Sequence, residues 1–368
     1  MEDLGIREDF WRNKRVLLTG HTGFKGSWLS LWLQHLQAQV VGLSLAPPTS
    51  LNLFELASVA DEMVHLIGDI RNAELVDEVV KTYSPDIIIH MAAQSLVRPA
   101  YEDPLLTYQT NVMGTLHVLE AARQSDSVKA VVNVTSDKCY ATHLGNYTFH
   151  EIDPLGGDDP YSSSKGAAEI LTHSYYHSFF KFQHKGLASA RAGNVIGGGD
   201  WALDRLIPDM MRSLISQATL EIRYPQAVRP WQHVLEPLCG YLLLAEKLYE
   251  NPSKYSEGWN FGPDESDSKT VQWIVEQCTS YLGEEWQFKM AEVSPEWHEA
   301  ACLRLNSEKA RRHLQWQPHW NINAALLKTI EWYQFYQRKK DMKVVTLEQI
   351  KSYCMKTEYL QENVDAVL

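Results

Sequence analysis

The sequence predicts an α/β protein in which a doubly wound parallel sheet is followed by a smaller C-terminal lobe. Two observations lead to this class. Short β-branched segments alternate with longer amphipathic ones over roughly the first half of the chain, which is typical of β-α-β units. The first apolar segment also runs directly into a glycine-rich turn. With 368 residues, 45% of them hydrophobic, the chain can bury a core of this size.

The expected strands and helices follow one another in chain order. The strands are residues 15–20, 39–45, 63–69, 86–91, 130–136 and 187–191, and the helices are residues 26–37, 72–83, 104–124 and 160–181. After residue 193 the alternation gives way to loop-rich segments that carry many of the tryptophans. We therefore predict a sheet domain at 1–193, a substrate-binding lobe at 194–337 that returns some strands to the sheet, and a helical tail at 338–368.

Composition excludes several classes of function. A net charge of −12 without any long basic run argues against nucleic-acid binding. The charged N-terminal segment and the short apolar runs argue against a leader or a membrane span, which predicts a cytoplasmic protein without a membrane partner. The five cysteines include no C-x-x-C pair, so neither a disulfide framework nor a metal site is indicated.

The glycine-rich turn is the first candidate site. Residues 16–28 read VLLTGHTGFKGSW, an apolar strand that leads through three glycines into a helix. Such a turn lets backbone N–H groups at the helix start approach a pyrophosphate. The candidate residues for binding a dinucleotide here are Gly20, His21, Thr22, Gly23, Phe24, Lys25 and Gly26.

The second candidate is Tyr161 with Lys165, which lie one helical turn apart and so share a helix face. A lysine ammonium beside a phenol lowers the phenol's pKa from its usual value of about 10, so that the tyrosine can act as a base. The spacing alone also occurs in ordinary surface pairs.

These motifs together resemble the extended branch of the short-chain dehydrogenase/reductase family. TGHTGFKG, the Tyr161–Lys165 pair and RAGNVIGGGDW at 191–201 carry the resemblance, which covers most of residues 14–330. It implies a Rossmann-type fold, NAD as cofactor, a homodimer formed through the 104–124 and 160–181 helices, and Ser136 as the partner of Tyr161 and Lys165. It also implies cofactor contacts from Asp69, Ile70, Ala92, Ala93, Gln94, Asn111, Thr135, Tyr161, Lys165 and Arg191.

The chain departs from the family pattern in two places. His21 stands where relatives have a small residue, which predicts a pyrophosphate contact that is looser or built differently. The end of the second strand, LSLAPPTS, has no acidic residue for the adenosine ribose, so NAD rather than NADP rests on the resemblance. Asp69 has an alternative reading as the N-cap of the 72–83 helix.

Asp137 and Lys138 directly follow Ser136 and suggest the type of reaction. Epimerases of the family carry small uncharged residues there, whereas nucleotide-sugar 4,6-dehydratases carry an acid and a base that remove water across C5 and C6 of the sugar. Most have Asp-Glu, and the Asp-Lys pair resembles the branch that acts on CDP-glucose in deoxysugar and O-antigen biosynthesis. Asp137 is the acid and Lys138 the base by that analogy, but Asp137 as base with Lys138 as a stabilising cation stays open. Both side chains reach one site only if the chain bends after Ser136.

A nucleotide-sugar substrate also needs polar and cationic groups for its diphosphate. By resemblance the candidates are Ser95, Asn194, Arg205, Arg229 and Arg304. Two other functions are weighed against the dehydratase: a nucleotide-sugar epimerase or reductase, which would have no use for the Asp-Lys pair, and a non-catalytic dinucleotide-binding regulator, which would have no use for a tyrosine base.

Overall fold

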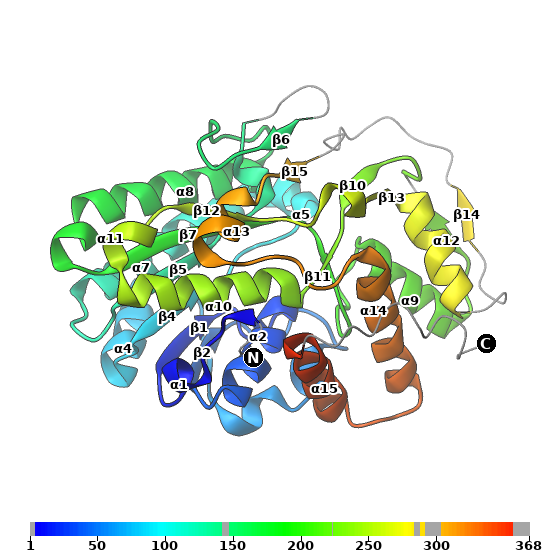
Figure 1. Cartoon of the computed structure of the whole chain (residues 1–368), viewed down its shortest axis with the longest axis horizontal. Helices are drawn as coiled ribbons and strands as arrows, with labels where there is room; N and C mark the ends of the chain where they lie inside the picture. The colour runs from blue at the N-terminus through cyan, green and yellow to red at the C-terminus, as the bar shows by residue number, and fades with distance from the viewer. Residues whose placement is uncertain (1–3, 142–146, 223, 283–287, 291–302, 356–368) are drawn as a thin grey trace.

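The computed structural model describes residues 4–141, 147–222, 224–282, 288–290 and 303–355 (Figure 1). Its centre is a seven-stranded sheet in the order β12-β7-β5-β4-β1-β2-β3, and all neighbouring strands are parallel. These strands are β1 (Arg15–Thr19), β2 (Gln39–Ser44), β3 (Val64–Ile67), β4 (Ile87–His90), β5 (Ala130–Val134), β7 (Gly186–Ala192) and β12 (Gly258–Phe261). The strand order reverses between β1 and β4, so the predicted doubly wound α/β fold is confirmed.

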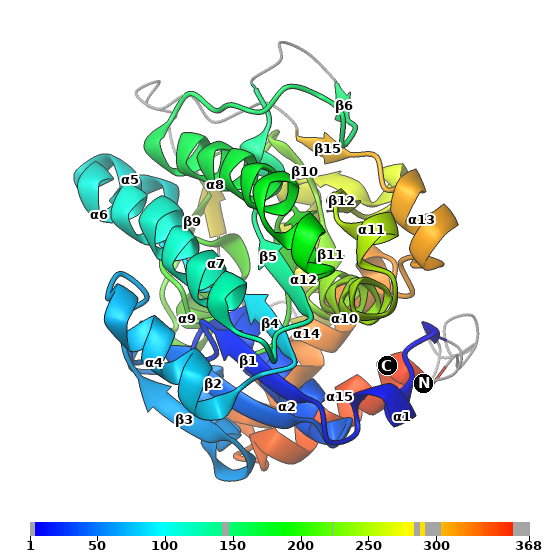
Figure 2. The ribbon, with the colours of Figure 1, turned by 90° about the vertical axis from the view of Figure 1, so that its left-hand side faces the viewer.

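Helices cover both faces of the sheet (Figure 2). One face carries α4 (Ala73–Tyr83), α7 (Thr115–Gln124) and α8 (Pro160–Ser178), and the other carries α2 (Phe24–His35) and α10 (Leu235–Glu250). The strands are buried between them, because β4, β5 and β7 have no exposed residue. Two separate hydrophobic clusters result, one on each face.

The chain after β5 also forms short sheets and helices outside the main sheet. Its two-stranded sheets pair β8 (Val195–Ile196) with β11 (Gln232–His233), β9 (Leu220–Ile222) with β14 (Phe288–Met290), β10 (Val228–Pro230) with β13 (Ser268–Thr270), and β6 (Thr148–Phe149) with β15 (Arg304–Leu305). Its helices are α9 (Leu206–Ser216), α11 (Pro252–Tyr255), α12 (Val271–Leu282), α13 (Glu308–Leu314), α14 (Ile322–Gln337) and α15 (Met342–Cys354).

Later parts of the chain also return to the main sheet and to a helix that covers it. β12 pairs with β7 as the edge strand, and α15 packs against α2. The domain boundaries after residues 193 and 337 stay a prediction, and the last part of the expected tail, 356–368, lies outside the described residues.

Shorter helices lie between these elements. They are α1 (Glu8–Trp11), α3 (Leu53–Leu56), α5 (Val97–Glu102) and α6 (Pro104–Tyr108), followed by a π-helix at Gln109–Gly114 and 3-10 helices at Val59–Glu62, Asp137–Cys139, Phe180–Gln183 and Glu265–Asp267. The expected 104–124 helix is thus a run of α6, π-helix and α7. Within the described ranges, no helix combines the length and apolar character that crossing a membrane requires.

Candidate active site

The glycine turn between β1 and α2 has two glycines that packing requires. Gly20 has φ +79°, and a Cβ there would lie 2.7 Å from the Ala92 nitrogen. A Cβ at Gly26 would lie 2.1 Å from the Gly20 carbonyl oxygen. Gly23 differs, because the nearest described atom to a Cβ there is 3.4 Å away and its φ of −76° suits any residue. Protein packing therefore leaves room at Gly23, at the N-terminus of α2, and a pyrophosphate fits this position.

His21 is directed into the sheet. Its buried ring fills the space above Gly42, where a Cβ would lie 2.4 Å from the His21 Cγ, and its Nε2 lies 2.6 Å from Nδ1 of His65. Burial, reinforced by His65, lowers the pKa of His21 to about 4, so the ring is neutral. Any phosphate contact of this residue therefore falls to its backbone. The Thr22 hydroxyl also makes its hydrogen bonds within the protein, with the Ser44 hydroxyl and to the Leu45 carbonyl.

Lys25 connects the glycine turn with the catalytic candidates. Burial, together with the positive charges of Arg205 and Lys165, lowers the pKa of Lys25 to about 8, although Asp137 acts in the opposite direction. These interactions place Lys25 within electrostatic range of Asp137. Sequence reasoning assigned Lys25 only to the dinucleotide loop, since spacing along the chain does not reveal how far its side chain reaches. Beside it, the Phe24 ring would lie 3.1 Å from a Cβ at Gly197.

Asp69 and Ile70 follow β3 as expected. Asp69 accepts hydrogen bonds from the backbone and guanidinium of Arg71, which lower its pKa. The N-cap of α4 is Asn72, so the alternative role of Asp69 as that cap does not apply. Ile70 is buried against Gly114. A hollow of about 390 Å³ opens here, lined by Asp69, Arg71, Asn72, Gln109, Met113 and His117.

The segment after β4 is held by a polar network. Thr19 Oγ1 accepts from the Ala92 nitrogen at 3.2 Å, and Asn111, within the π-helix, bonds with both backbone groups of Gln94. The Asn111 amide also donates to Ser164 at 2.9 Å, and Ser164 donates to the Tyr161 carbonyl. Asn111 therefore fixes the 92–94 segment to the first turn of α8. Ala93 is half-buried in this segment, and Ser95, which follows it, is exposed.

The chain bends after Ser136, as the Asp-Lys hypothesis requires. Ser136 caps a 3-10 helix at Asp137–Cys139, its hydroxyl accepting from the Lys138 nitrogen at 3.2 Å and donating to Asp137 Oδ1 at 2.9 Å. Asp137 is buried, whereas Lys138 is half-buried. Burial raises the pKa of Asp137, although Lys138, the Ser136 hydrogen bond and Lys25 act in the opposite direction.

Tyr161 and Lys165 lie on the first turns of α8. The helix begins with Pro160 behind Asp159, whose carboxylate accepts from the Tyr161 nitrogen at 2.9 Å. Burial raises the pKa of Tyr161 to about 12, against the effect of a hydrogen bond with Ser136. Lys165 donates to the Val134 carbonyl at 3.3 Å, and burial lowers its pKa to about 8. Ser136, Asp137, Tyr161 and Lys165 thus meet where β5 ends.

Arg205, a substrate candidate, lies within electrostatic range of this cluster. Its guanidinium pairs with Asp200 at 2.9 Å, and its charge lowers the pKa of Tyr161 and of Lys25. Arg229 donates to the Val228 carbonyl, and Arg304 pairs with Glu265 at 2.7 Å. Asn194 is exposed just beyond β7. The assignments of Arg229, Arg304 and Asn194 to substrate binding stay predictions.

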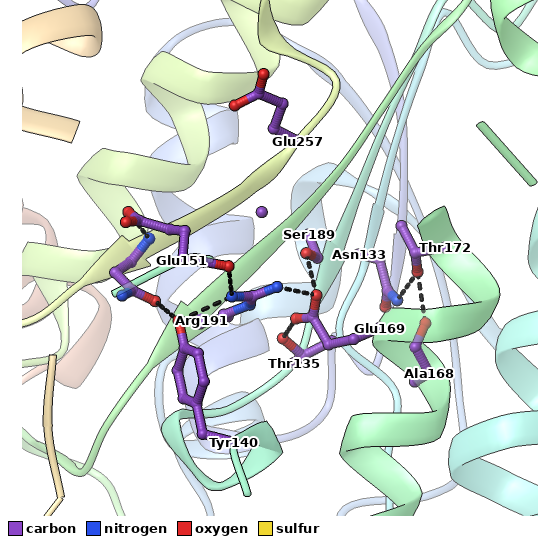
Figure 3. Close-up of polar contacts among 12 residues, drawn as sticks. Asn133, Thr135, Tyr140, Glu151, Ala168, Glu169, Thr172, Ser189, Arg191 and Glu257 are labelled. Carbon is purple, nitrogen blue, oxygen red and sulfur yellow. Dashed lines mark hydrogen bonds and ion pairs between the residues drawn. The ribbon is translucent and has the colours of Figure 1, made fainter. Parts of the chain in front are cut away.

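Two of the expected cofactor residues, Thr135 and Arg191, bind the same buried carboxylate, Glu169 (Figure 3). Sequence reasoning missed Glu169, although its spacing of four residues after Lys165 places it on the same face of α8. The cofactor assignments of Thr135 and Arg191 also stay predictions. Within the ranges that the structure describes, no group of three or more His, Cys, Asp or Glu side chains is arranged to hold a metal ion.

The strand order, the glycine turn and the Ser136–Tyr161–Lys165 cluster define the class as an extended short-chain dehydrogenase/reductase. The chain belongs to the GDP-mannose 4,6 dehydratase family, whose model matches residues 17–329. It is 48% identical over 358 residues to the CDP-glucose 4,6-dehydratase of Salmonella typhimurium, covering 96% of this chain and 99% of that one.

Solved structures agree with this class. The dTDP-glucose 4,6-dehydratase of Bacillus anthracis in complex with NAD matches with a TM-score of 0.71 and 25% identity, over 90% of this chain and 99% of that one. The UDP-glucose 4-epimerase of Brucella ovis in complex with NAD has a TM-score of 0.74 over 86% of this chain and 97% of that one. At 20% identity, the epimerase match shows the fold alone.

Proposed function

We propose that this protein is an NAD-dependent nucleotide-sugar 4,6-dehydratase that converts CDP-glucose to CDP-4-keto-6-deoxyglucose and water. One observation carries the proposal: the 3-10 turn that carries Asp137 and Lys138 directly follows Ser136 and packs against α8, and Ser136 hydrogen-bonds with Tyr161 of that helix. The 48% identity to a CDP-glucose 4,6-dehydratase supports the choice of substrate. Oxidation alone needs the tyrosine and serine, and the charged pair supplies the groups for removing water.

Each residue has a defined task in this reaction. When bound, NAD would supply the hydride acceptor for C4 and the hydride donor for C6, with Lys138 returning its proton to C5, so that the cofactor is not consumed. Tyr161 takes the C4 hydroxyl proton while Ser136 holds that hydroxyl, and the Lys165 ammonium stabilises the phenolate. The resulting C4 ketone makes the C5 proton acidic. Lys138 in its neutral form takes that proton as Asp137 protonates the C6 hydroxyl, so the C6–O bond breaks, water leaves and a C5–C6 double bond forms.

The burial of Asp137 favours the proposed division of labour. Raising the pKa of this carboxyl group favours its protonated form, which is the form that can give a proton to a leaving hydroxyl. In the alternative mechanism, Asp137 takes the C5 proton and Lys138 stabilises the enolate as a cation. The variant Lys138→Met distinguishes the two mechanisms. If Lys138 is the base, this variant oxidises C4 but loses exchange of the C5 proton with deuterated solvent. Normal C5 exchange in Lys138→Met would rule out Lys138 as the base.

The activity is tested by incubating the protein and NAD with CDP-glucose, dTDP-glucose and UDP-glucose in parallel. We expect a 4-keto-6-deoxy product, measured by its absorbance in base, with CDP-glucose preferred. Absence of product from all three would refute the dehydratase. Inversion at C4 without loss of water would identify an epimerase instead.

We also propose a homodimer formed through the α6–α7 segment and α8. The support is a set of large apolar side chains left exposed on these elements, among them Leu105 (67%), Met113 (44%) and Ile170 (60%). Sedimentation velocity should give a dimer for the wild type and a monomer for Ile170→Glu. A wild-type monomer would refute this assembly.

We further propose that the protein acts in the cytoplasm, supplying a precursor for deoxysugars such as those of O-antigens. Cys139, Cys239, Cys278 and Cys354 are buried free thiols, which suits a reducing compartment. Fractionation of cells that express the protein, with immunodetection, tests the location, and recovery outside the cytoplasmic fraction would contradict it.

A further inference from the structure

We propose that the buried Glu169–Arg191 ion pair positions the dehydration residues by holding both ends of the segment Thr135–Tyr140. The inference rests on the proposed function, because it assigns Asp137 and Lys138 to the removal of water. Glu169 lies on α8 and Arg191 on β7, and both side chains are almost completely buried. Neither is placed in contact with the reacting sugar, so both are positioning residues.

Glu169 holds the first end of the segment (Figure 3). One carboxylate oxygen accepts from the Thr135 hydroxyl, and Thr135 directly precedes Ser136. The other oxygen accepts from the Ser189 hydroxyl at 2.5 Å and from Arg191 at 2.7 Å. Both carboxylate oxygens therefore accept hydrogen bonds, and residues of strand β7 as well as helix α8 hold the carboxylate in position.

Arg191 holds the second end. Its guanidinium donates to the Tyr140 hydroxyl at 2.8 Å and lies 5.0 Å from the centre of the Tyr140 ring. Tyr140 in turn donates to Asn260 Oδ1 at 2.7 Å. A Cβ at Gly258 would lie 2.5 Å from the Arg191 guanidinium, so the neighbouring strand β12 leaves room for it. The ion pair thus reaches Thr135 through one partner and Tyr140 through the other.

A buried ion pair is weak evidence for stability, because desolvation of the charges offsets much of their attraction. Its directional hydrogen bonds do fix geometry, and a misplacement of about 1 Å can slow a reaction about 100-fold. The same carboxylate also acts on the oxidation step, because Glu169 raises the pKa of Lys165 against the stronger effect of burial. One buried group therefore contacts or influences both halves of the site.

A matched pair of variants tests the positioning role. Thr135→Val and Ser189→Ala each remove one hydroxyl that donates to Glu169, but only Thr135 belongs to the segment that carries the reacting groups. Tyr140→Phe removes the contact at the other end without changing a charge. Two steps are measured with CDP-glucose and NAD: the absorbance of reduced nicotinamide, which reports oxidation at C4, and deuterium entry at C5, which reports the first step of dehydration.

We expect Tyr140→Phe to oxidise C4 at close to the wild-type rate and to exchange C5 about 10- to 100-fold more slowly. Thr135→Val, at a residue that is also a cofactor candidate, should lose C5 exchange by about 10-fold more than it loses C4 oxidation. Ser189→Ala should leave both steps close to wild type. Equal behaviour of Thr135→Val and Ser189→Ala would overturn the positioning role, as would an equal loss of both steps in Thr135→Val and Tyr140→Phe. A wild type that performs neither step with any nucleotide sugar overturns the proposed function instead, which separates the two failures.

A double variant that removes both charges of the ion pair tests the same role without leaving a buried charge unpaired. Glu169→Gln alone leaves Arg191 buried without a counter-charge, whereas the double variant Glu169→Gln with Arg191→Met leaves no unpaired charge. We expect the double variant to fold, as urea unfolding would show, and to lose C5 exchange by more than it loses C4 oxidation. Full C5 exchange in this folded variant would refute the inference.

Discussion

The contrast between Gly23 and Gly26 gives the sharpest test of the cofactor site. Gly26→Ala would place a methyl group 2.1 Å from a backbone oxygen, which only a main-chain shift can relieve, so we expect a loss of at least about 3 kcal/mol in unfolding free energy. Gly23→Ala has no contact below 3.4 Å. Its smaller unfolded-state entropy stabilises by about 0.4–1 kcal/mol, and alanine is a poorer N-cap than glycine by a similar amount. We expect the two to cancel within about 0.5 kcal/mol.

Gly23→Ala should nevertheless lose NAD, because its methyl group would occupy the position where a pyrophosphate approaches the helix start. An overpacking cost of about 1–3 kcal/mol corresponds to roughly a 5- to 150-fold weaker affinity. Urea unfolding measures the stability of each variant, and calorimetric titration measures NAD binding. Wild-type affinity in a stable Gly23→Ala protein would refute the assignment of this turn to the pyrophosphate.

Three further predictions concern buried charges. Asp137→Asn should oxidise C4 yet form little 4-keto-6-deoxy product, because an amide cannot protonate the C6 hydroxyl; normal turnover would contradict this. Burial raises the pKa of Glu236 to about 7, so the folded protein holds a proton that the unfolded chain releases near pH 4.5, and raising the pH favours unfolding. Between pH 4 and pH 8, the unfolding free energy of the wild type, measured with urea, should fall by about 3 kcal/mol more than that of Glu236→Gln. The same pH dependence in both proteins would show that Glu236 does not couple stability to pH. Lys185 donates to three carbonyls at the end of α7, so Lys185→Met should lower the unfolding free energy by about 2 kcal/mol with unchanged turnover.

The sequence predicted the parts that depend on local spacing. The alternation of apolar runs specified the parallel sheet, and the four-residue step from Tyr161 to Lys165 specified a shared helix face. The bend after Ser136 was a condition of the hypothesis, and the 3-10 turn at Asp137–Cys139 meets it. These features involve residues close together in the chain.

Long-range packing was not visible in the sequence. His21 was expected to disturb a phosphate contact, yet its ring lies against Gly42, and no pattern connects a residue after one strand with a glycine inside the next. Arg191 was read only through the family motif, whereas its buried partner Glu169 lies 22 residues away on a helix across the sheet. Such pairings depend on how elements pack, which a period of 2 or 3.6 residues does not encode.

The segment Thr135–Tyr140 needs the Glu169–Arg191 ion pair because the main sheet ends before it. Backbone pairing between β5 and β7 continues to the Thr135 nitrogen, which donates to the Ala190 carbonyl, and Tyr140 forms an isolated bridge with Leu155. Asp137 and Lys138 lie between these points, and no described strand pairs with either residue. Candidates such as Gly20, directly after β1, are held by the ladder itself, because the Gly20 nitrogen still donates to β2. A residue two or three positions beyond the ladder needs side chains to take over that task, and Glu169 and Arg191 provide them at both ends of the turn.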